Sequence, residues 1–590
     1  MARVSFAWRW TQIFFATGAL AASARTQEPL RVIAEWEPAV GTMVTWPLGI
    51  PSSLVVELAE DDHLFVIVKD AAGQSAAAAA FAGWGIDPTH VDYVIAPVQT
   101  HWPRDWGPHQ IFDAQGNWSI VDPIFQGYPW TAPTCDVVVN SPGGHAGDDV
   151  VNQYVAAHFG APLVSLPAYL TGGNVLVDGF DAAFSTCTMV GENLQVWTEQ
   201  EFLALAKQQL GIDDYRLVAA TENNGIQHID CWFKPLDEET LLVKRAPVGH
   251  EEHARIEANV GVLASLKNHW GRPYRIVRID CPYYNSTKIA AYCNSLILNR
   301  KVFVPLFNIP GDTRALDTFA AALPGYEVIG FPWSSWYYYD ALHCRTRALF
   351  DREMLRMTHR RLDVVVPALS GHRIEAFVDA KSGAGLAPGS PSVNWRLAGA
   401  TTWSSLALAP TGAANTFAVD LPGQAPGARV EYFVAAADLS GRSETLPRSA
   451  PAGFHSFDVA PSVGTSYCAS GAHGAHIGTT GTHSVAANEL VLHALPVPKH
   501  VNGIFFYGDL QKQLPFGNGT LCVGATATLA RLGPPTNAGI AGELVRALDV
   551  TDPPTPSALI TPGSTWNFQA WFRDGASFDL SDALQVTFVP

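Results

Sequence analysis

The periodicity of apolar residues changes near Pro367, and no fold of a single class accommodates both patterns. Before this point, helical and strand patterns alternate along the chain. Thr198-Glu199-Gln200-Glu201 opens an apolar-periodic run that stops at Gly211, which predicts a capped amphipathic helix. Short β-branched runs at 63–68 and 301–307 predict buried strands. We therefore expect an α/β region from about residue 30 to residue 362.

Beyond Pro367 the helical pattern disappears, and Gly, Pro, Ser and Asn separate short alternating runs. Such runs are typical of a β-sandwich, and they lie at 373–378, 391–397 and 429–435. Residues 453–465 predict a linker, and a second strand-rich block then ends at 566–572. These boundaries predict an α/β domain at 25–365 followed by two all-β sandwich-like modules, at 366–460 and 461–590.

The first residues have the pattern of a signal peptide at 1–24. Arg3 and Arg9 flank a short basic region, an apolar stretch follows, and Ala22-Ser23-Ala24 is a small-residue cleavage site. A membrane anchor is disfavoured because the apolar stretch is shorter than the ~18 residues that span a bilayer. We therefore expect an exported protein, secreted, periplasmic or on the cell surface, without a membrane span after cleavage.

The charge balance narrows the class of ligand. The chain carries 37 basic and 54 acidic residues, a formal net charge of −17. Because the signal peptide contains two arginines and no acid, cleavage changes this charge to −19. An acidic surface argues against nucleic acid as a partner and weakly favours a cationic ligand.

Eight cysteines are too few for a disulfide-dense scaffold in a chain of 590 residues. Cys468 and Cys522 stand alone in the last part of the chain and are a plausible disulfide. No spacing is C-x-x-C, which disfavours a structural zinc site and a thioredoxin-like redox site.

The first candidate site residue is Asp105, within the segment 101–108 that two prolines and a glycine exclude from regular structure. Its ordinary role would be a turn-capping carboxylate. The functional alternative is a carboxylate that binds a cation, with a neighbouring indole ring available to cover a planar group.

A second candidate pair is His228 and Asp230. If the segment is extended, alternation places both side chains on one side, with Ile229 and Cys231 on the other. The pair is then either a structural hydrogen bond or a general acid/base beside a cation-binding carboxylate.

The third candidate is Cys344. A buried cysteine is usually an inert apolar residue. Here His343 and Arg345 flank it, and positive neighbours favour the thiolate that a nucleophilic cysteine requires.

Taken together and in this order, five segments resemble the bacterial peptidylarginine deiminase family, which is grouped with agmatine deiminases among guanidine-modifying enzymes. The resemblance covers about 30–355 and rests on the motifs WPRDWGP (102–108), GGN (172–174), HIDCW (228–232), CNSLILN (293–299) and DALHCRT (340–346). It implies a pentein fold, which is a pseudo-fivefold α/β propeller of ββαβ units. The module at 366–460 is similar to the immunoglobulin/fibronectin-like domain that follows the catalytic domain in the bacterial enzyme.

The resemblance also implies the roles of the site residues. Cys344 matches the nucleophile, His228 the general acid/base, and Asp105 and Asp230 the two guanidinium-binding carboxylates. Asn294 matches a further catalytic-site position, and Trp102 an aromatic wall that binds substrate. The implied reaction forms a covalent thiouronium on the cysteine, and it requires no metal or organic cofactor.

The chain departs from the family pattern after Asp122. The bacterial enzymes have arginines there that bind the carboxylate of a C-terminal arginine, whereas 123–147 contains neither Arg nor Lys. The expected function is therefore a secreted deiminase of arginine in peptides or proteins, without required selectivity for C-terminal arginine. The alternatives are a deiminase of agmatine or another small guanidine, and a non-catalytic exported binding or adhesion protein. A papain-like protease is disfavoured because the histidine precedes the cysteine in sequence.

Overall fold

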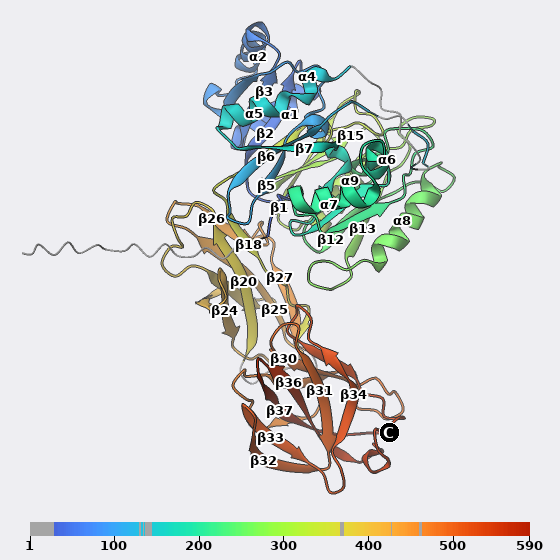
Figure 1. The fold of residues 1–590 in the computed structure, drawn as a ribbon, viewed down its shortest axis with the longest axis vertical. Coiled ribbons are helices and arrows are strands. Elements are labelled where there is room, and N and C mark those ends of the chain that lie inside the picture. Colours follow the sequence, from blue (N-terminus) through green and yellow to red (C-terminus); the bar gives the residue numbers. More distant parts are fainter. Residues whose placement is uncertain are drawn as a thin grey trace, which may run out of the picture.

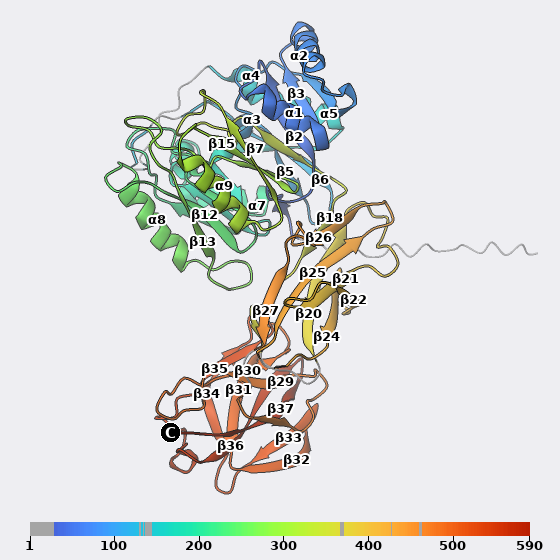
Figure 2. The same ribbon diagram turned by 180° about the vertical axis from the view of Figure 1, so that it is seen from behind.

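A computed structural model describes residues 29–128, 131–133, 135, 144–365, 371–425, 427–459 and 463–590. The expected signal peptide at 1–24 lies outside these residues. Three blocks follow one another along the long axis of the molecule (Figure 1). The α/β domain lies at one end, the strands β18 to β27 form the middle, and β28 to β37 form the other end, as the opposite view also shows (Figure 2).

The α/β domain contains five sheets that repeat one topology. In each unit, two antiparallel strands are followed by a helical segment and a third strand parallel to the second. The second unit contains β5 (His109–Phe112), β6 (Trp118–Ile124), α4 (Ala146–Asp149), α5 (Val151–Phe159) and β7 (Leu163–Tyr169), with β1 (Arg31–Val32) added at its edge. The third contains β8 (Leu176–Val177), β9 (Ala182–Thr186), α6 (Thr188–Asn193), α7 (Glu199–Leu210) and β10 (Asp214–Val218). The fourth contains β11 (Phe233–Pro235), β12 (Thr240–Arg245), α8 (His253–Ser265) and β13 (Arg275–Asp280), and the fifth contains β14 (Leu296–Leu298), β15 (Lys301–Leu306), α9 (Gly311–Ala322) and β16 (Glu327–Pro332).

The first unit joins the two ends of the domain. Its first strand is β17 (Arg347–Phe350), which pairs antiparallel with β2 (Ala39–Trp46) across about 300 residues of sequence. The unit continues with α1 (Ser52–Asp61), β3 (His63–Val68), α2 (Ala71–Gly83), a short 3₁₀ turn (Pro88–His90) and β4 (Val91–Ile95). The last strand of the domain thus completes the first sheet.

Local sequence explains several of these elements. Thr198 and Glu201 form the expected capping box, and Gly211 ends α7 in the left-handed conformation with φ 72°. The runs at 63–68 and 301–307 form β3 and β15 as predicted. Phe319 of α9 shares an apolar cluster with Val302 and Val304 of β15, so the helix covers its own unit's sheet.

After residue 355, the described residues contain strands and one 3₁₀ turn but no α-helix. The middle block has two sheets that share one apolar core. One sheet contains β18 (Leu355–Thr358), β20 (His372–Ala380), β24 (Thr416–Leu421) and β23 (Ala409–Pro410). The other contains β19 (Val364–Val365), β27 (His455–Val459), β25 (Arg429–Ala437), β21 (Ser392–Leu397), β22 (Ser404–Ala407) and β26 (Ser443–Leu446). Because β27 occupies 455–459, the prediction of a linker at 453–465 is wrong for this part.

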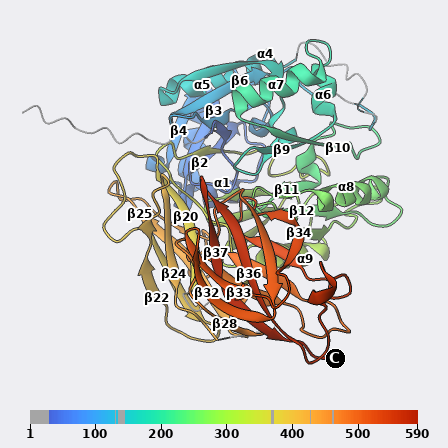
Figure 3. The same cartoon turned by 60° about the horizontal axis from the view of Figure 1, so that its bottom comes forward.

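The last block contains one five-stranded sheet, a three-stranded sheet and a hairpin. The five-stranded sheet contains β28 (Thr465–Tyr467), β37 (Ser577–Thr587), β36 (Thr565–Asp574), β31 (Asn502–Gly508) and β34 (Ala530–Asn537). The three-stranded sheet contains β29 (His476–Thr480), β30 (Val491–Leu495) and β35 (Leu544–Ala547). The hairpin pairs β32 (Leu510–Phe516) with β33 (Gly519–Gly524). Pro556–Ala558 forms the 3₁₀ turn. The paired strands β36 and β37 lie side by side in Figure 3.

Two disulfides connect described residues. Cys468 bonds to Cys522, which confirms the predicted pair, and Cys135 bonds to Cys187, which the sequence did not indicate. In the part of the chain that the structure covers, no helix has both the length and the apolar character needed to cross a membrane.

Candidate active site

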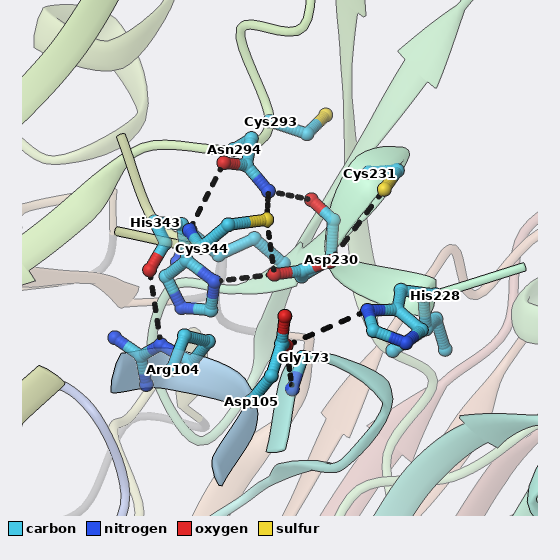
Figure 4. A network of polar contacts seen from close by, with 12 residues as sticks. Arg104, Asp105, Gly173, His228, Asp230, Cys231, Cys293, Asn294, His343 and Cys344 are labelled. Carbon is cyan, nitrogen blue, oxygen red and sulfur yellow. Dashed lines mark hydrogen bonds and ion pairs between the residues drawn. The ribbon is translucent and has the colours of Figure 1, made fainter. Parts of the chain in front are cut away.

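Turns between strands of different units bring the predicted residues together (Figure 4). Asp105 lies on the short helix α3 (Pro103–Trp106), so the expectation that 101–108 lacks regular structure is wrong for these residues, because a proline is tolerated in the first turn of a helix. Asp230 lies on a 3₁₀ turn at Ile229–Cys231, with His228 just before it. Asn294 precedes β14, and Cys344 precedes β17. Residues separated by more than 200 positions therefore meet in one buried cluster.

Asn294 positions the thiol of Cys344. Its amide Nδ2 donates to Sγ at 3.2 Å, while its Oδ1 accepts the backbone N–H of Cys344 at 3.2 Å. The thiol also lies 3.7 Å from Oδ2 of Asp230. The cysteine is 1% exposed, so its position is set by these partners and the surrounding packing.

The expectation that His343 and Arg345 favour the thiolate is wrong, because both side chains are paired with carboxylates. Arg345 binds both carboxylate oxygens of Asp340 at 2.7 and 2.8 Å, and the ring nitrogens of His343 face carboxylates. Burial, and then the charge of Asp230, raise the pKa of the Cys344 thiol well above its usual value. A positive charge that enters the site would instead favour the thiolate.

The two carboxylates differ in their surroundings. Oδ1 of Asp105 accepts the Gly173 N–H at 3.1 Å, and Oδ2 accepts the Tyr128 hydroxyl at 2.9 Å. Burial and the nearby charge of Asp230 raise the pKa of Asp105 well above its usual value. Although burial opposes it, the hydrogen bond from His343 lowers the pKa of Asp230. A bound cation would allow both carboxylates to ionise.

His228 faces the carboxylate pair. Its Nδ1 lies 3.5 Å from Oδ1 of Asp105, and within the described residues neither ring nitrogen has a hydrogen-bond partner. Burial lowers the pKa of His228 to about 4, so the ring is neutral near pH 7 and can accept a proton. The predicted extended conformation is wrong, because Ile229–Cys231 forms a 3₁₀ turn whose first N–H donates to Oδ1 of Asn174. The turn nevertheless presents both His228 and Asp230 to the site.

The two tryptophans near Asp105, Trp102 and Trp106, differ in their exposure. Trp102 is half-buried and contacts Tyr128 edge-on, with ring centroids 5.2 Å apart. Trp106 is 1% exposed and donates its indole N–H to Thr100, so it belongs to the core. Trp102 is thus placed beside the Tyr128 hydroxyl that binds Asp105.

Gly173 is required by the close approach of three site groups. A Cβ at this position would lie 2.6 Å from Asp105 Oδ1, 2.8 Å from His228 Nδ1 and 3.1 Å from Asp230 Oδ2. A side chain would therefore displace the carboxylates or the imidazole.

Sequence reasoning missed Tyr128, Glu35 and Lys234 as contributors to the site. Glu35 lies between β1 and β2 and contacts His343, and Lys234 of β11 binds Glu35 at 2.6 Å. Lys234 is 1% exposed within a strand. The signal available in the sequence was a lysine within the apolar run 231–236. Such a run is expected to be buried, and a buried ammonium requires a partner.

A buried thiol, a neutral imidazole and two carboxylates form a site suited to thiol-dependent hydrolysis of a cationic group. A family model described as "Porphyromonas-type peptidyl-arginine deiminase" matches residues 31–349, more than half of the chain. The chain belongs to this family, and it is a guanidino-group deiminase of the peptidyl-arginine deiminase and agmatine deiminase group.

Several known proteins are similar to the α/β domain. A Shewanella sp. (strain W3-18-1) protein named "Putative agmatine deiminase" is 23% identical over 352 residues, covering 52% of this chain and 90% of the relative. Among solved structures, an agmatine deiminase of Enterococcus faecalis is 19% identical with a TM-score of 0.47, covering 55% of this chain and 96% of that chain. An agmatine deiminase of C. jejuni is 17% identical with a TM-score of 0.44 and the same coverage.

Proposed function

We propose that the protein is a secreted deiminase that converts peptidyl arginine to peptidyl citrulline and ammonia. The observation that carries the proposal is the convergence of Cys344, His228, Asp105 and Asp230 in one buried cluster. The match to peptidyl-arginine deiminases supports the substrate class.

In the first step, Asp105 and Asp230 bind the substrate guanidinium. A guanidinium is a planar set of N–H donors, and two carboxylates can hold it in a fixed orientation. Its charge offsets the repulsion between the two aspartates and favours the Cys344 thiolate. Binding therefore creates the nucleophile and places it beside the central guanidinium carbon.

In the second step, His228 takes the thiol proton and the thiolate attacks the guanidinium carbon. A C–S bond forms, and the resulting tetrahedral intermediate collapses by breaking one C–N bond. His228 delivers the proton to the departing nitrogen, which leaves as ammonia, and a thiouronium remains on Cys344.

In the third step, water attacks the thiouronium carbon while His228 accepts a proton. The C–S bond breaks, the thiol is restored, and the product carries a ureido group. This scheme uses side chains of the chain and water alone.

The substrate is proposed to include internal arginine. The segment 123–147 supplies no Arg or Lys to bind an α-carboxylate, and Tyr128 from this segment instead binds Asp105. Export, inferred from the pattern at 1–24, makes peptides and proteins available as substrates. The five ββαβ units are proposed to form a pentein propeller. The predicted modules at 366–460 and 461–590 are proposed as accessory domains, with β18 and β19 added to the first of them, because these strands pair with β20 and β27.

The test is to incubate the mature chain with agmatine, free arginine, and peptides with internal or C-terminal arginine, and to measure ureido product. We expect turnover of both peptides and its loss in Cys344→Ser. Full activity of Cys344→Ser, or no turnover of any substrate, would contradict the proposal.

Agmatine is the second candidate substrate, because the curated relatives that match over 90% of their length carry that name. Turnover of agmatine with no turnover of either peptide would select it. A binding protein without catalysis is disfavoured because Cys344, His228, Asp105 and Asp230 lie together in one buried cluster.

A further inference from the structure

His343 lies in a buried position between two carboxylates. Its Nδ1 is 2.7 Å from Asp230 Oδ2, and its Nε2 is 2.5 Å from Glu35 Oε2. The imidazole side chain is 0% exposed, and that of Glu35 is 10% exposed. Both ring nitrogens are therefore engaged with acidic side chains from separate parts of the chain.

Proton counting constrains the charge of this arrangement. Each of the two hydrogen bonds requires one proton, so Glu35, His343 and Asp230 share two protons. The protons lie both on the imidazole, or one on the imidazole and one on a carboxylate. In either case the three groups together carry a net charge of −1.

Two cations compensate that charge from behind the site. Lys234 Nζ lies 2.6 Å from Glu35 Oε1, and Arg104 Nη2 lies 3.2 Å from Glu35 Oε2. Glu35 also accepts the Ile297 N–H at 2.9 Å, which fixes its carboxylate. Every partner of Glu35 is buried or nearly so. The Glu35 carboxylate is therefore held in a fixed position on the side of His343 that faces away from Asp230.

We propose that His343 is a positioning residue, which transmits the fixed geometry of Glu35 to Asp230 and holds that carboxylate in the orientation that receives the guanidinium. The role rests on the proposed function of Asp230. The same oxygen of Asp230 that binds His343 faces the Cys344 thiol at 3.7 Å. Rotation of the carboxylate would therefore displace a cation from the thiol.

Two alkylating reagents test this role directly. Iodoacetamide is neutral and reports thiol reactivity alone, whereas chloroacetamidine is a small planar cation that Asp105 and Asp230 should bring to Cys344. We expect wild-type protein to prefer chloroacetamidine. His343→Gln should reduce that preference by about tenfold to a hundredfold, because it removes a charge-assisted hydrogen bond to Asp230.

A pair of variants separates positioning from a structural role. The amide nitrogen of Asn lies near the position of imidazole Nδ1, and that of Gln near Nε2. His343→Asn should therefore keep the donor to Asp230 and more of the amidine preference, although it loses Glu35. His359→Gln, at a buried histidine of the middle block, is the matched control and should leave the preference unchanged.

The outcomes distinguish the two proposals. If folded His343→Gln keeps the wild-type amidine preference, or if Asn and Gln reduce it equally, the positioning role is overturned. Wild-type protein without any amidine preference would overturn it as well. A preference that falls as expected, in a protein that yields no ureido product from any guanidine, supports positioning and counts against the proposed function alone.

Discussion

Two buried histidines, one in the α/β domain and one in the β region, have similar pKa values but opposite surroundings. Burial lowers the pKa of both His228 and His359 to about 4. His359 binds the Glu375 carbonyl at 2.6 Å and the Tyr432 hydroxyl at 2.8 Å, whereas His228 has no hydrogen-bond partner within the described residues. A lowered pKa therefore does not identify a site by itself. What distinguishes His228 is a ring without a hydrogen-bond partner that faces the carboxylates of Asp105 and Asp230.

The largest expected difference is in turnover. His228→Gln should lower kcat by about a hundredfold to ten-thousandfold, because it removes the proposed general acid/base. His359→Gln should change kcat by less than about twofold, since it lies outside the site. Ureido production by both purified variants measures this, with circular dichroism as a check on folding. Equal losses in the two variants would break the comparison.

The two histidines should resemble each other in their effect on stability with pH. Each has an unfolded pKa of about 6.5 and a folded pKa of about 4. Each therefore contributes stability that is present above about pH 6.5 and is lost as pH falls toward 4. Replacing either with Gln should flatten the pH dependence of unfolding free energy by up to about 3 kcal/mol.

Urea unfolding at several pH values between 7 and 4 measures this effect. If the unfolding free energy of either variant falls with pH as steeply as that of the wild type, the replaced histidine is not held neutral in the folded state.

Close packing distinguishes the site further. Gly173→Ala should lower kcat/KM by about tenfold to a hundredfold, because the added methyl group displaces Asp105 or His228. The matched control is Gly261→Ala in α8, where a Cβ would meet nothing within 4 Å. That variant should keep full activity. Unchanged activity in Gly173→Ala would show that the site accommodates a side chain there.

The smallest effect is expected at Tyr432. Its hydroxyl accepts the Leu362 N–H at 2.9 Å as well as contacting His359. Tyr432→Phe should therefore lower the free energy of unfolding by about 1–2 kcal/mol without altering turnover. Thermal and urea unfolding check the first part, and the ureido assay checks the second.

Local features of the fold were predictable, and long-range ones were not. The capping box of α7 and the apolar run of β3 depend on neighbouring residues, so the sequence indicates both. The pairing of β17 with β2 depends on residues about 300 positions apart, and no local sequence pattern predicts it. The five-unit arrangement came from a family resemblance instead.

The site shows the same division. Asp105, His228, Asp230 and Cys344 lie in recognisable motifs, but Glu35 lies outside them, two residues before a second glutamate, Glu37. The error about the thiolate has a similar cause. Sequence proximity placed Arg345 beside Cys344, whereas the folded chain pairs that arginine with Asp340.

The closing strand β17 also sets the order in which the site is completed. A growing chain acquires Asp105, His228 and Asp230 first, and it acquires Cys344 only a few residues before β17. A fragment that ends between residues 230 and 344 contains Asp105, His228 and Asp230, the proposed carboxylates and base, but lacks Cys344, the proposed nucleophile. In the order of synthesis, the proposed nucleophile is therefore the last of these residues to be added, just before the strand that closes the first sheet.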